Sequence, residues 1–163
     1  MSNLELDTVK RVRKALAEVG QPDAVREVAD ASSSTAEALG VEPGALVKTQ
    51  VFTIGNRYVF VMVAGDHACS EEQLPKVFNL QGDVVRPSAD LVRAVTGFSS
   101  GGLSPVGSVS KLPTAIDASL KRFDKIYAAA GHANCVFETS ADELKSLTNG
   151  LVSYAVAKPA DPS

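Results

Sequence analysis

Two apolar, β-branched runs at the centre of the chain, residues 46–54 and 58–64, constrain the fold most strongly. They are separated by Gly55-Asn56-Arg57. Val, Ile, Thr, Phe and Tyr favour strands, and a Gly-Asn pair is typical of a tight turn between antiparallel strands. The pattern therefore predicts a β-hairpin within a sheet. Because both runs fall far short of the roughly 18 apolar residues that a membrane-spanning helix needs, we expect no such helix.

Other elements are predicted on both sides of this hairpin. Apolar residues at helical spacing indicate an N-terminal helix over about 4–19, with Gly20 as its C-terminal cap. Capping boxes at 34–37, 70–73 and 140–143 predict helix starts, because Ser and Glu or Gln side chains there satisfy free backbone N–H groups. The expected helices are 34–40, 70–80, 88–95 and 140–150, and the expected strands are 24–29, 84–86, 113–117, 125–130, 136–138 and 151–157.

The size and composition of the chain fit one compact domain. It has 163 residues, of which 45% are hydrophobic and 21% charged, so it can bury a core. No repeat or linker divides it, and we expect a single domain over 1–163 that ends in a polar tail at 158–163. Strands and helices interleave irregularly. This order predicts an α+β fold with a mixed, barrel-like β-sheet surrounded by helices.

The charge balance is mildly acidic, with 16 Lys and Arg against 19 Asp and Glu. Proteins held on nucleic acid by bulk charge usually carry a basic excess, so only a local basic patch remains available for such contacts. The basic clusters at 10–14 and 121–125 are either that patch or ordinary solvated faces. Asp117, Asp124 and Glu138 are interpreted as solvated or turn residues. Two distant cysteines and a charged N-terminus favour a cytoplasmic protein.

A glycine-rich stretch at 97–107 holds four glycines and one proline in eleven positions. Glycine permits positive φ and a close approach of ligand to backbone, and free N–H groups in such loops bind anions or carbonyl oxygens. The stretch lacks the Gly-Lys-Ser/Thr of a phosphate-binding loop and the spacing of a dinucleotide fingerprint. A ligand-binding loop and a long plain connection both remain open.

Lys48 interrupts an apolar strand. It either faces solvent or stands at a cleft wall, where its ammonium group would bind a phosphate or a carbonyl oxygen. His67, Cys69, His132 and Cys135 raise the hypotheses of a zinc site or of a Cys–His nucleophile pair. Their spacing is not that of a strong structural zinc site, and free cysteine is often a small core residue. A structural role is therefore favoured over either hypothesis, and both remain open.

Four blocks of sequence occur in the order and spacing of a known family. They are Val47-Lys48-Thr49, Thr96-Gly-Phe-Ser-Ser-Gly-Gly-Leu-Ser-Pro-Val-Gly107, Leu112-Pro-Thr-Ala-Ile-Asp117 and Ile126-Tyr-Ala-Ala-Ala-Gly131. Together they resemble the YbaK/ProX family of free-standing aminoacyl-tRNA deacylases, which is related to the editing domain inserted in bacterial prolyl-tRNA synthetases. The resemblance covers about 24–157 and implies a compact α+β domain with a barrel-like mixed sheet.

The reaction implied by this resemblance is hydrolysis of the ester between a wrongly attached small amino acid and the terminal ribose of tRNA, often tRNA for proline. A small amino acid cannot be excluded from a larger pocket by binding alone, so translation fidelity requires a second, hydrolytic sieve. The implied partners are aminoacyl-tRNA and, given the acidic charge, prolyl-tRNA synthetase or another carrier. Neither a membrane nor DNA is implied.

The resemblance also implies a site. Lys48 matches the family's functional lysine and would hold the terminal adenosine or its phosphate and stabilise charge near the ester. The implied substrate-binding residues are Thr49, Gly101, Gly102, Ser104, Pro105 and Gly107, with His132 and Asn134 across the pocket. Backbone N–H groups of the loop would polarise the ester carbonyl. A water positioned with help from the neighbouring ribose hydroxyl would attack it, without a metal.

The sequence departs from the family pattern at two places. The family's YbaK branch carries a tyrosine in the stretch corresponding to 27–34 and an aspartate in the one corresponding to 135–137, and both are absent here. The stretch 34–40 resembles the alanine-type and still unassigned branches more closely than the cysteine-type branch. A second hypothesis is therefore a non-catalytic paralogue that only docks on tRNA or a synthetase. A zinc-dependent hydrolase is the third.

Overall fold

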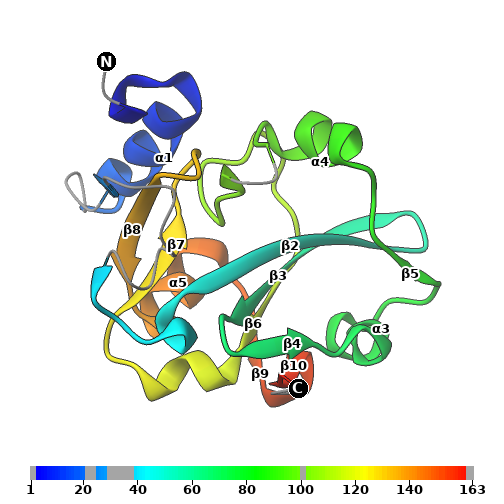
Figure 1. Cartoon of the computed structure of the whole chain (residues 1–163). Helices are drawn as coiled ribbons and strands as arrows, with labels where there is room; N and C mark the ends of the chain where they lie inside the picture. The colour runs from blue at the N-terminus through cyan, green and yellow to red at the C-terminus, as the bar shows by residue number, and fades with distance from the viewer. Residues whose placement is uncertain (1–2, 21–24, 29–38, 100–101, 161–163) are drawn as a thin grey trace.

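The computed structural model describes residues 3–20, 25–28, 39–99 and 102–160 of the chain. Its centre is the hairpin of β2 (Val47–Ile54) and β3 (Arg57–Ala64), which crosses the molecule in Figure 1. The two strands pair antiparallel from Val47 opposite Ala64 to Ile54 opposite Arg57. The turn between them contains Gly55 at a φ of +62°. The hairpin predicted from the sequence is confirmed.

Five strands form the central mixed sheet, in the order β5-β2-β3-β6-β9. Besides the hairpin, they are β5 (Val84–Val85), β6 (Thr114–Asp117) and β9 (Leu151–Ser153). β5 is antiparallel to β2, whereas β6 is parallel to both β3 and β9. The predicted α+β class and mixed sheet are confirmed. The sheet is open rather than a closed barrel, since its edge strands β5 and β9 do not pair with each other in the described part of the chain.

Two smaller antiparallel sheets flank the central one. The first contains β1 (Val25–Glu27), β8 (Cys135–Thr139) and β7 (Ile126–Ala129), and the second contains β4 (His67–Cys69) and β10 (Ala157–Pro159). An isolated parallel bridge between Leu46 and Tyr127 connects the first sheet to the start of β2. The β7–β8 end of the molecule is therefore held close to the segment that carries Lys48.

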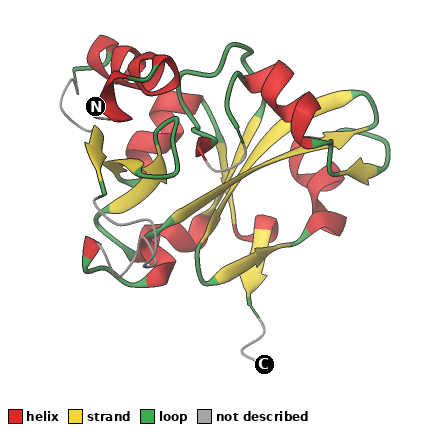
Figure 2. Cartoon of the chain, turned by 45° about the horizontal axis from the view of Figure 1, so that its top comes forward, coloured by secondary structure: helices red, strands yellow, loops and turns green. Residues whose placement is uncertain are grey.

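Helices surround the sheets (Figure 2). They are η1 (Asn3–Glu5), α1 (Asp7–Glu18), η2 (Pro43–Ala45), η3 (Glu71–Gln73), α3 (Leu74–Phe78), α4 (Ala89–Thr96), η5 (Ala118–Arg122), α5 (Ala141–Thr148) and η6 (Tyr154–Val156), where η denotes a 3₁₀ helix. The predicted N-terminal helix is present as η1 and α1. No described helix is long and apolar enough to cross a membrane.

The three predicted capping boxes have different outcomes. Ser140 caps α5, since its Oγ accepts a hydrogen bond from the Glu143 N–H at 3.1 Å. The box is not completed, because the Glu143 carboxylate accepts a hydrogen bond from the Thr139 hydroxyl. Ser70 makes no capping side-chain bond. The expected helix 70–80 is two short helices, because Pro75 lacks an N–H and fits only the first turn of α3. The box at 34–37 lies outside the described residues.

The C-terminal segment corrects a further expectation. The predicted strand 151–157 is broken into β9, η6 and β10. Ser153 Oγ accepts a hydrogen bond from the Ala155 N–H at 3.1 Å, which turns the chain into η6. The chain then pairs with β4 through Ala157, Lys158 and Pro159 instead of ending in a tail that begins at 158.

The core lies on both faces of the hairpin. Val47 and Val51 pack with Phe60 and Met62 toward α1, β7, β8 and α5. The alternate residues of β3, such as Val61, face a second cluster that contains residues of α3 and η6. Because successive side chains of a strand point to opposite faces, every position of β3 from 59 to 64 is buried.

Candidate functional site

The glycine-rich stretch and the turn after β7 form one structural unit. The Gly131 N–H donates to the Gly102 carbonyl at 3.0 Å. A Cβ on Gly102 would lie 2.5 Å from both the Gly131 carbonyl carbon and the His132 nitrogen, a separation that real Cβ atoms do not adopt. Gly102 is therefore required where the two loops touch. The structure thus brings two predicted site segments together, while Gly101 lies outside the described residues.

His132 and Asn134 shape the turn that faces this loop. His132 Nδ1 accepts a hydrogen bond from the Asn134 N–H at 3.0 Å. When Nδ1 is an acceptor, the proton of a neutral imidazole resides on Nε2. The Asn134 carbonyl accepts from the Val28 N–H at 2.6 Å, which connects the turn to β1. His132 can therefore present an N–H donor while its other nitrogen holds the turn.

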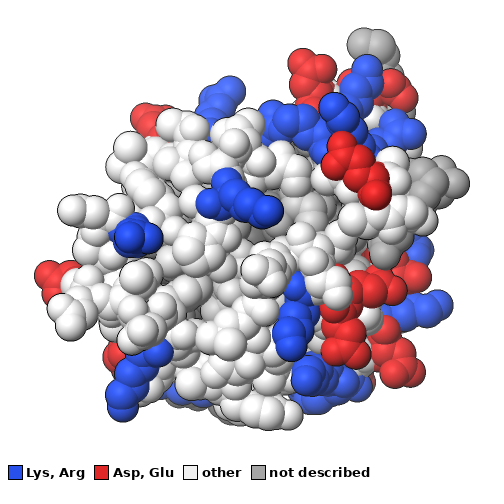
Figure 3. Space-filling model, turned by 180° about the vertical axis from the view of Figure 1, so that it is seen from behind, with Lys and Arg blue, Asp and Glu red and all other residues white. Residues whose placement is uncertain are grey.

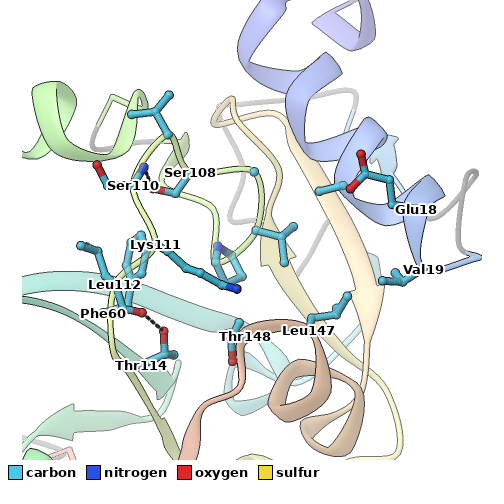
Figure 4. A pocket seen from close by; sticks show the side chains of 15 residues that line it. Glu18, Val19, Phe60, Ser108, Ser110, Lys111, Leu112, Thr114, Leu147 and Thr148 are labelled. Atoms are coloured by element: carbon cyan, nitrogen blue, oxygen red, sulfur yellow. Dashed lines mark hydrogen bonds between the residues drawn. The ribbon is translucent and has the colours of Figure 1, made fainter.

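The later part of the glycine-rich stretch is buried against the core and borders a cavity. Ser104 is fully buried, and its Oγ accepts from the Val106 N–H at 3.1 Å. Pro105 and Gly107 help to line a cavity of about 440 Å³ together with Phe60 and Lys111. In Figure 4 the Lys111 side chain crosses the opening from the loop toward Thr148 and Leu147 of α5. Two of the predicted loop residues therefore line a cavity.

Lys48 lies apart from this cavity. It pairs with Val63, whereas Thr49 pairs with Met62, so their side chains project from opposite faces of β2. The Lys48 ammonium is exposed and donates a hydrogen bond to the His67 carbonyl of β4. Thr49 Oγ1 is buried and has no hydrogen-bond partner among the described residues. The structure thus separates Lys48 from the cavity that Pro105 and Gly107 border.

Comparison with known proteins decides the family. The model of the aminoacyl-tRNA editing domain matches residues 26–147, which include Lys48 and both loops. This chain belongs to the aminoacyl-tRNA editing domain family. The resemblance inferred from the four sequence blocks is thereby confirmed, and helix α1 lies outside the matched residues.

Several individual proteins are similar to this chain. A protein of Enterococcus faecalis named as a candidate Cys-tRNA(Pro)/Cys-tRNA(Cys) deacylase, EbsC, is 31% identical over 78% of this chain and 77% of its own length. A proline–tRNA ligase of Bacillus cytotoxicus is 32% identical over 58% of this chain, which is only 16% of the ligase. The solved structure of a candidate trans-editing enzyme for prolyl-tRNA synthetase has a TM-score of 0.85 at 29% identity, covering 95% of this chain and 99% of that one.

A buried carboxylate organises the strand ends beside Lys48 in this editing domain. Asp117 is 1% exposed, which contradicts its interpretation as a solvated residue and supports the alternative of a turn residue. Its Oδ2 accepts from the Ala64 N–H at 3.1 Å, and its Oδ1 accepts from the Ser119 N–H at 2.9 Å. Sequence analysis missed this role. The sequence signal is limited to the Asp itself, a favoured N-cap residue for the helix that follows, and its burial is not marked.

His67 lies beside that carboxylate and is fixed by it. Its Nδ1 is 3.3 Å from Asp117 Oδ2 and 3.2 Å from Ser119 Oγ. Next to it, Arg122 forms two hydrogen bonds to the Asp66 carboxylate, at 2.8 and 3.1 Å, which lower the pKa of Asp66 below its ordinary value. These contacts fix the part of β4 in which the His67 carbonyl accepts a hydrogen bond from Lys48.

The metal and thiol hypotheses find no geometric support in the editing domain. No group of three or more His, Cys, Asp or Glu residues in the described ranges is arranged to hold a metal ion. His67 and Cys69 lie in β4, whereas His132 lies in the turn before β8 and Cys135 is the first residue of that strand. Burial raises the pKa of both thiols to about 11, so they stay protonated at neutral pH, where a nucleophile must be a thiolate.

Proposed function

We propose that this editing domain is a trans-editing aminoacyl-tRNA deacylase. It hydrolyses the ester of a mischarged small amino acid on tRNA, with tRNA for proline as the substrate. The observation that carries the proposal is the family match over 26–147, which includes Lys48 and both loops. The names of EbsC and of the candidate trans-editing enzyme are consistent with the same chemistry.

Lys48 is the catalytic residue of the proposed reaction. Its ammonium group has three donors, and the described contacts use one of them, at the His67 carbonyl. The remaining N–H groups are available to hold the terminal adenosine or its phosphate and to stabilise negative charge that develops at the ester. A compact cation fixed at one point by a backbone carbonyl suits this task, because it needs no reorganisation during the reaction.

The loop and the turn supply the other groups. In this proposal, Gly101, Gly102, Pro105 and Gly107 wrap the aminoacyl group, the buried Ser104 contributes to substrate binding by holding the loop through Val106, and free backbone N–H groups polarise the ester carbonyl. His132 and Asn134 contact the amino group or the attacking water from the opposite loop. Thr49 faces the other side of β2 from Lys48, and its buried hydroxyl, which has no hydrogen-bond partner among the described residues, is proposed to contact the substrate from that side. The neighbouring ribose hydroxyl helps to position the water, and no metal takes part.

Substrate delivery by a partner follows from the charge of the chain. A net charge of -3 allows few phosphate contacts, so the affinity for tRNA alone is weak and depends little on salt. The middle of the face in Figure 3 is largely uncharged, with basic side chains spread over it and gathered at the upper right, and acidic ones mainly at the right edge. Prolyl-tRNA synthetase is the proposed carrier, because a related segment forms 16% of a proline–tRNA ligase.

A deacylation panel tests the proposal. The protein is mixed with tRNA for proline carrying alanine, cysteine, serine or proline, and with alanine on its own tRNA. We expect catalytic loss of one mischarged species and a fall in kcat of about 100-fold or more for Lys48→Ala. Lys76→Ala, at an exposed lysine of α3, is the matched control and should keep full activity.

Two results would argue against this function. Full activity of Lys48→Ala would remove the lysine from the mechanism. If no charged tRNA in the panel is hydrolysed while the protein still binds tRNA or the synthetase, the chain is the non-catalytic docking paralogue instead.

A further inference from the structure

Arg11 of α1 contacts both ends of the glycine-rich stretch. Its Nε donates to the Gly107 carbonyl at 3.1 Å, and its Nη2 donates to the Gly97 carbonyl at 3.0 Å. The guanidinium carbon also lies 4.8 Å from the centre of the Phe98 ring, which is fully buried. One side chain thereby connects two carbonyls that are ten residues apart in the sequence.

The glycines of this region make room for α1. A Cβ on Gly97 would lie 2.5 Å from Arg11 Nη2, and one on Gly107 would lie 3.1 Å from backbone atoms of α1. Across the site, a Cβ on Gly131 would lie 2.6 Å from the Thr8 carbonyl oxygen. All three glycines have positive φ, between +80° and +95°. The helix therefore touches both loops of the proposed site, and the positive φ at each contact favours glycine there.

The other basic side chains of the helix behave differently. Lys10 and Arg13 form exposed ion pairs with Glu5, each at 3.6 Å, and Arg13 also donates to the Leu4 carbonyl. These two ion pairs and the hydrogen bond all stay within the N-terminal segment. The apolar stripe of α1, which includes Val9 and Val12, is fully buried in the core. The helix is thus anchored independently of Arg11, whose two hydrogen bonds serve the loop.

We propose that Arg11 is a positioning residue that sets the conformation of the described parts of the glycine-rich loop, residues 97–99 and 102–107. Through the contact between Gly102 and Gly131, it also sets the position of the His132 turn. This role rests on the proposed deacylase function. A guanidinium is required because its planar fork reaches two carbonyls while its face stacks on Phe98, whereas an ammonium is a single point charge. The residue lies outside the matched family region, 26–147.

Three variants of the full chain test this role: Arg11→Met, Arg11→Lys and the matched control Arg13→Met. Hydrogen exchange of the amides at 97–99 and 102–107 reports on the loop without any substrate. We expect Arg11→Met to raise exchange there about 10-fold and to lower kcat by about 10- to 100-fold, with KM changed less than about 3-fold. Arg11→Lys should recover only a minor part of kcat, and Arg13→Met should match the wild type.

Unchanged loop exchange and unchanged kcat in Arg11→Met would overturn the proposal. Equally raised exchange in the β2–β3 hairpin would also overturn it, because the arginine would then act on global stability alone. A wild-type kcat in Arg11→Lys would refute the need for a planar guanidinium with two donors. If the wild type hydrolyses no charged tRNA, the deacylase function fails, and the exchange data still decide whether Arg11 holds the loop.

Discussion

The proposed site joins two regions that are built in opposite ways. Lys48 stands on a strand whose position is set by an eight-residue antiparallel ladder and by side-chain contacts around the buried Asp117. The glycine-rich loop and the His132 turn are instead held by backbone contacts at Gly102 and Gly131 and by α1. The strand region depends on its backbone ladder and on the hydrogen bonds of the Asp117 carboxylate. The loop region depends on the absence of side chains.

The largest effect is expected in the loop region, at Gly131→Ala. The new Cβ would lie 2.6 Å from the Thr8 carbonyl oxygen, at a φ of +95°. We expect the free energy of unfolding to fall by about 3 kcal/mol or more, measured by urea denaturation. Gly20→Ala is the control, because its φ is +83° with nothing within 4 Å, and should lose only about 1 kcal/mol. Equal losses in the two variants would mean that α1 does not press on the turn.

In the strand region, Asp117→Asn is expected to lower the free energy of unfolding the most. An asparagine offers one acceptor oxygen where the carboxylate accepts two backbone N–H groups, and its amide would face a donor. We expect a loss of about 2 kcal/mol in the free energy of unfolding. Asp124→Asn, at an exposed position, should change it by less than about 0.5 kcal/mol. A comparable loss at both positions would refute the organising role of Asp117.

A smaller, pH-dependent effect is expected at Asp66→Asn. Arg122 lowers the pKa of Asp66 in the folded state, so the pair stabilises the fold above the ordinary aspartate pKa of about 3.9. That contribution disappears as the pH falls through the lowered value. Both side chains are more than 40% exposed, so the difference from the wild type at neutral pH should stay below about 1 kcal/mol. A difference that persists at pH 2 in denaturation curves would exclude this pair as its cause.

The smallest effect on stability is expected at Lys48→Ala. The side chain is exposed and makes one hydrogen bond among the described residues, to the His67 carbonyl, so the free energy of unfolding should change by less than about 0.5 kcal/mol. Thermal and urea unfolding of the variant should overlay those of the wild type. A large loss of stability would show that the lysine is structural, and its effect on deacylation could not then be assigned to catalysis.

Local patterns predicted part of the fold correctly. The hairpin, the N-terminal helix and the helix starting after Ser88 are all present. The predictions failed where a distant partner competes with local preference. Ser70 fits a capping box, yet its N–H donates to the Val156 carbonyl, and no side-chain cap forms. The run after Gly150 has strand-forming residues, but Ser153 bends it so that β10 can pair with β4.

The candidate site divides in the same way. The family was accessible from four sequence blocks, because residue types at fixed spacing carry that information, and the proposal of Lys48 and the two loops as the site rests on the same resemblance. The buried Asp117 and the contacts of Arg11 were not accessible. Arg11 resembles its basic neighbours in the sequence, and only packing distinguishes it from Arg13.

By itself, then, the sequence determined the hairpin, the α+β class and the family, all of which depend on local propensity and on motif spacing. The tertiary structure alone decided which glycines meet α1, which carboxylate is buried and which face of β2 carries Lys48. The physical reason is that these properties belong to pairs of residues far apart in the chain. Their energies depend on close approach and burial, which arise only when the elements pack.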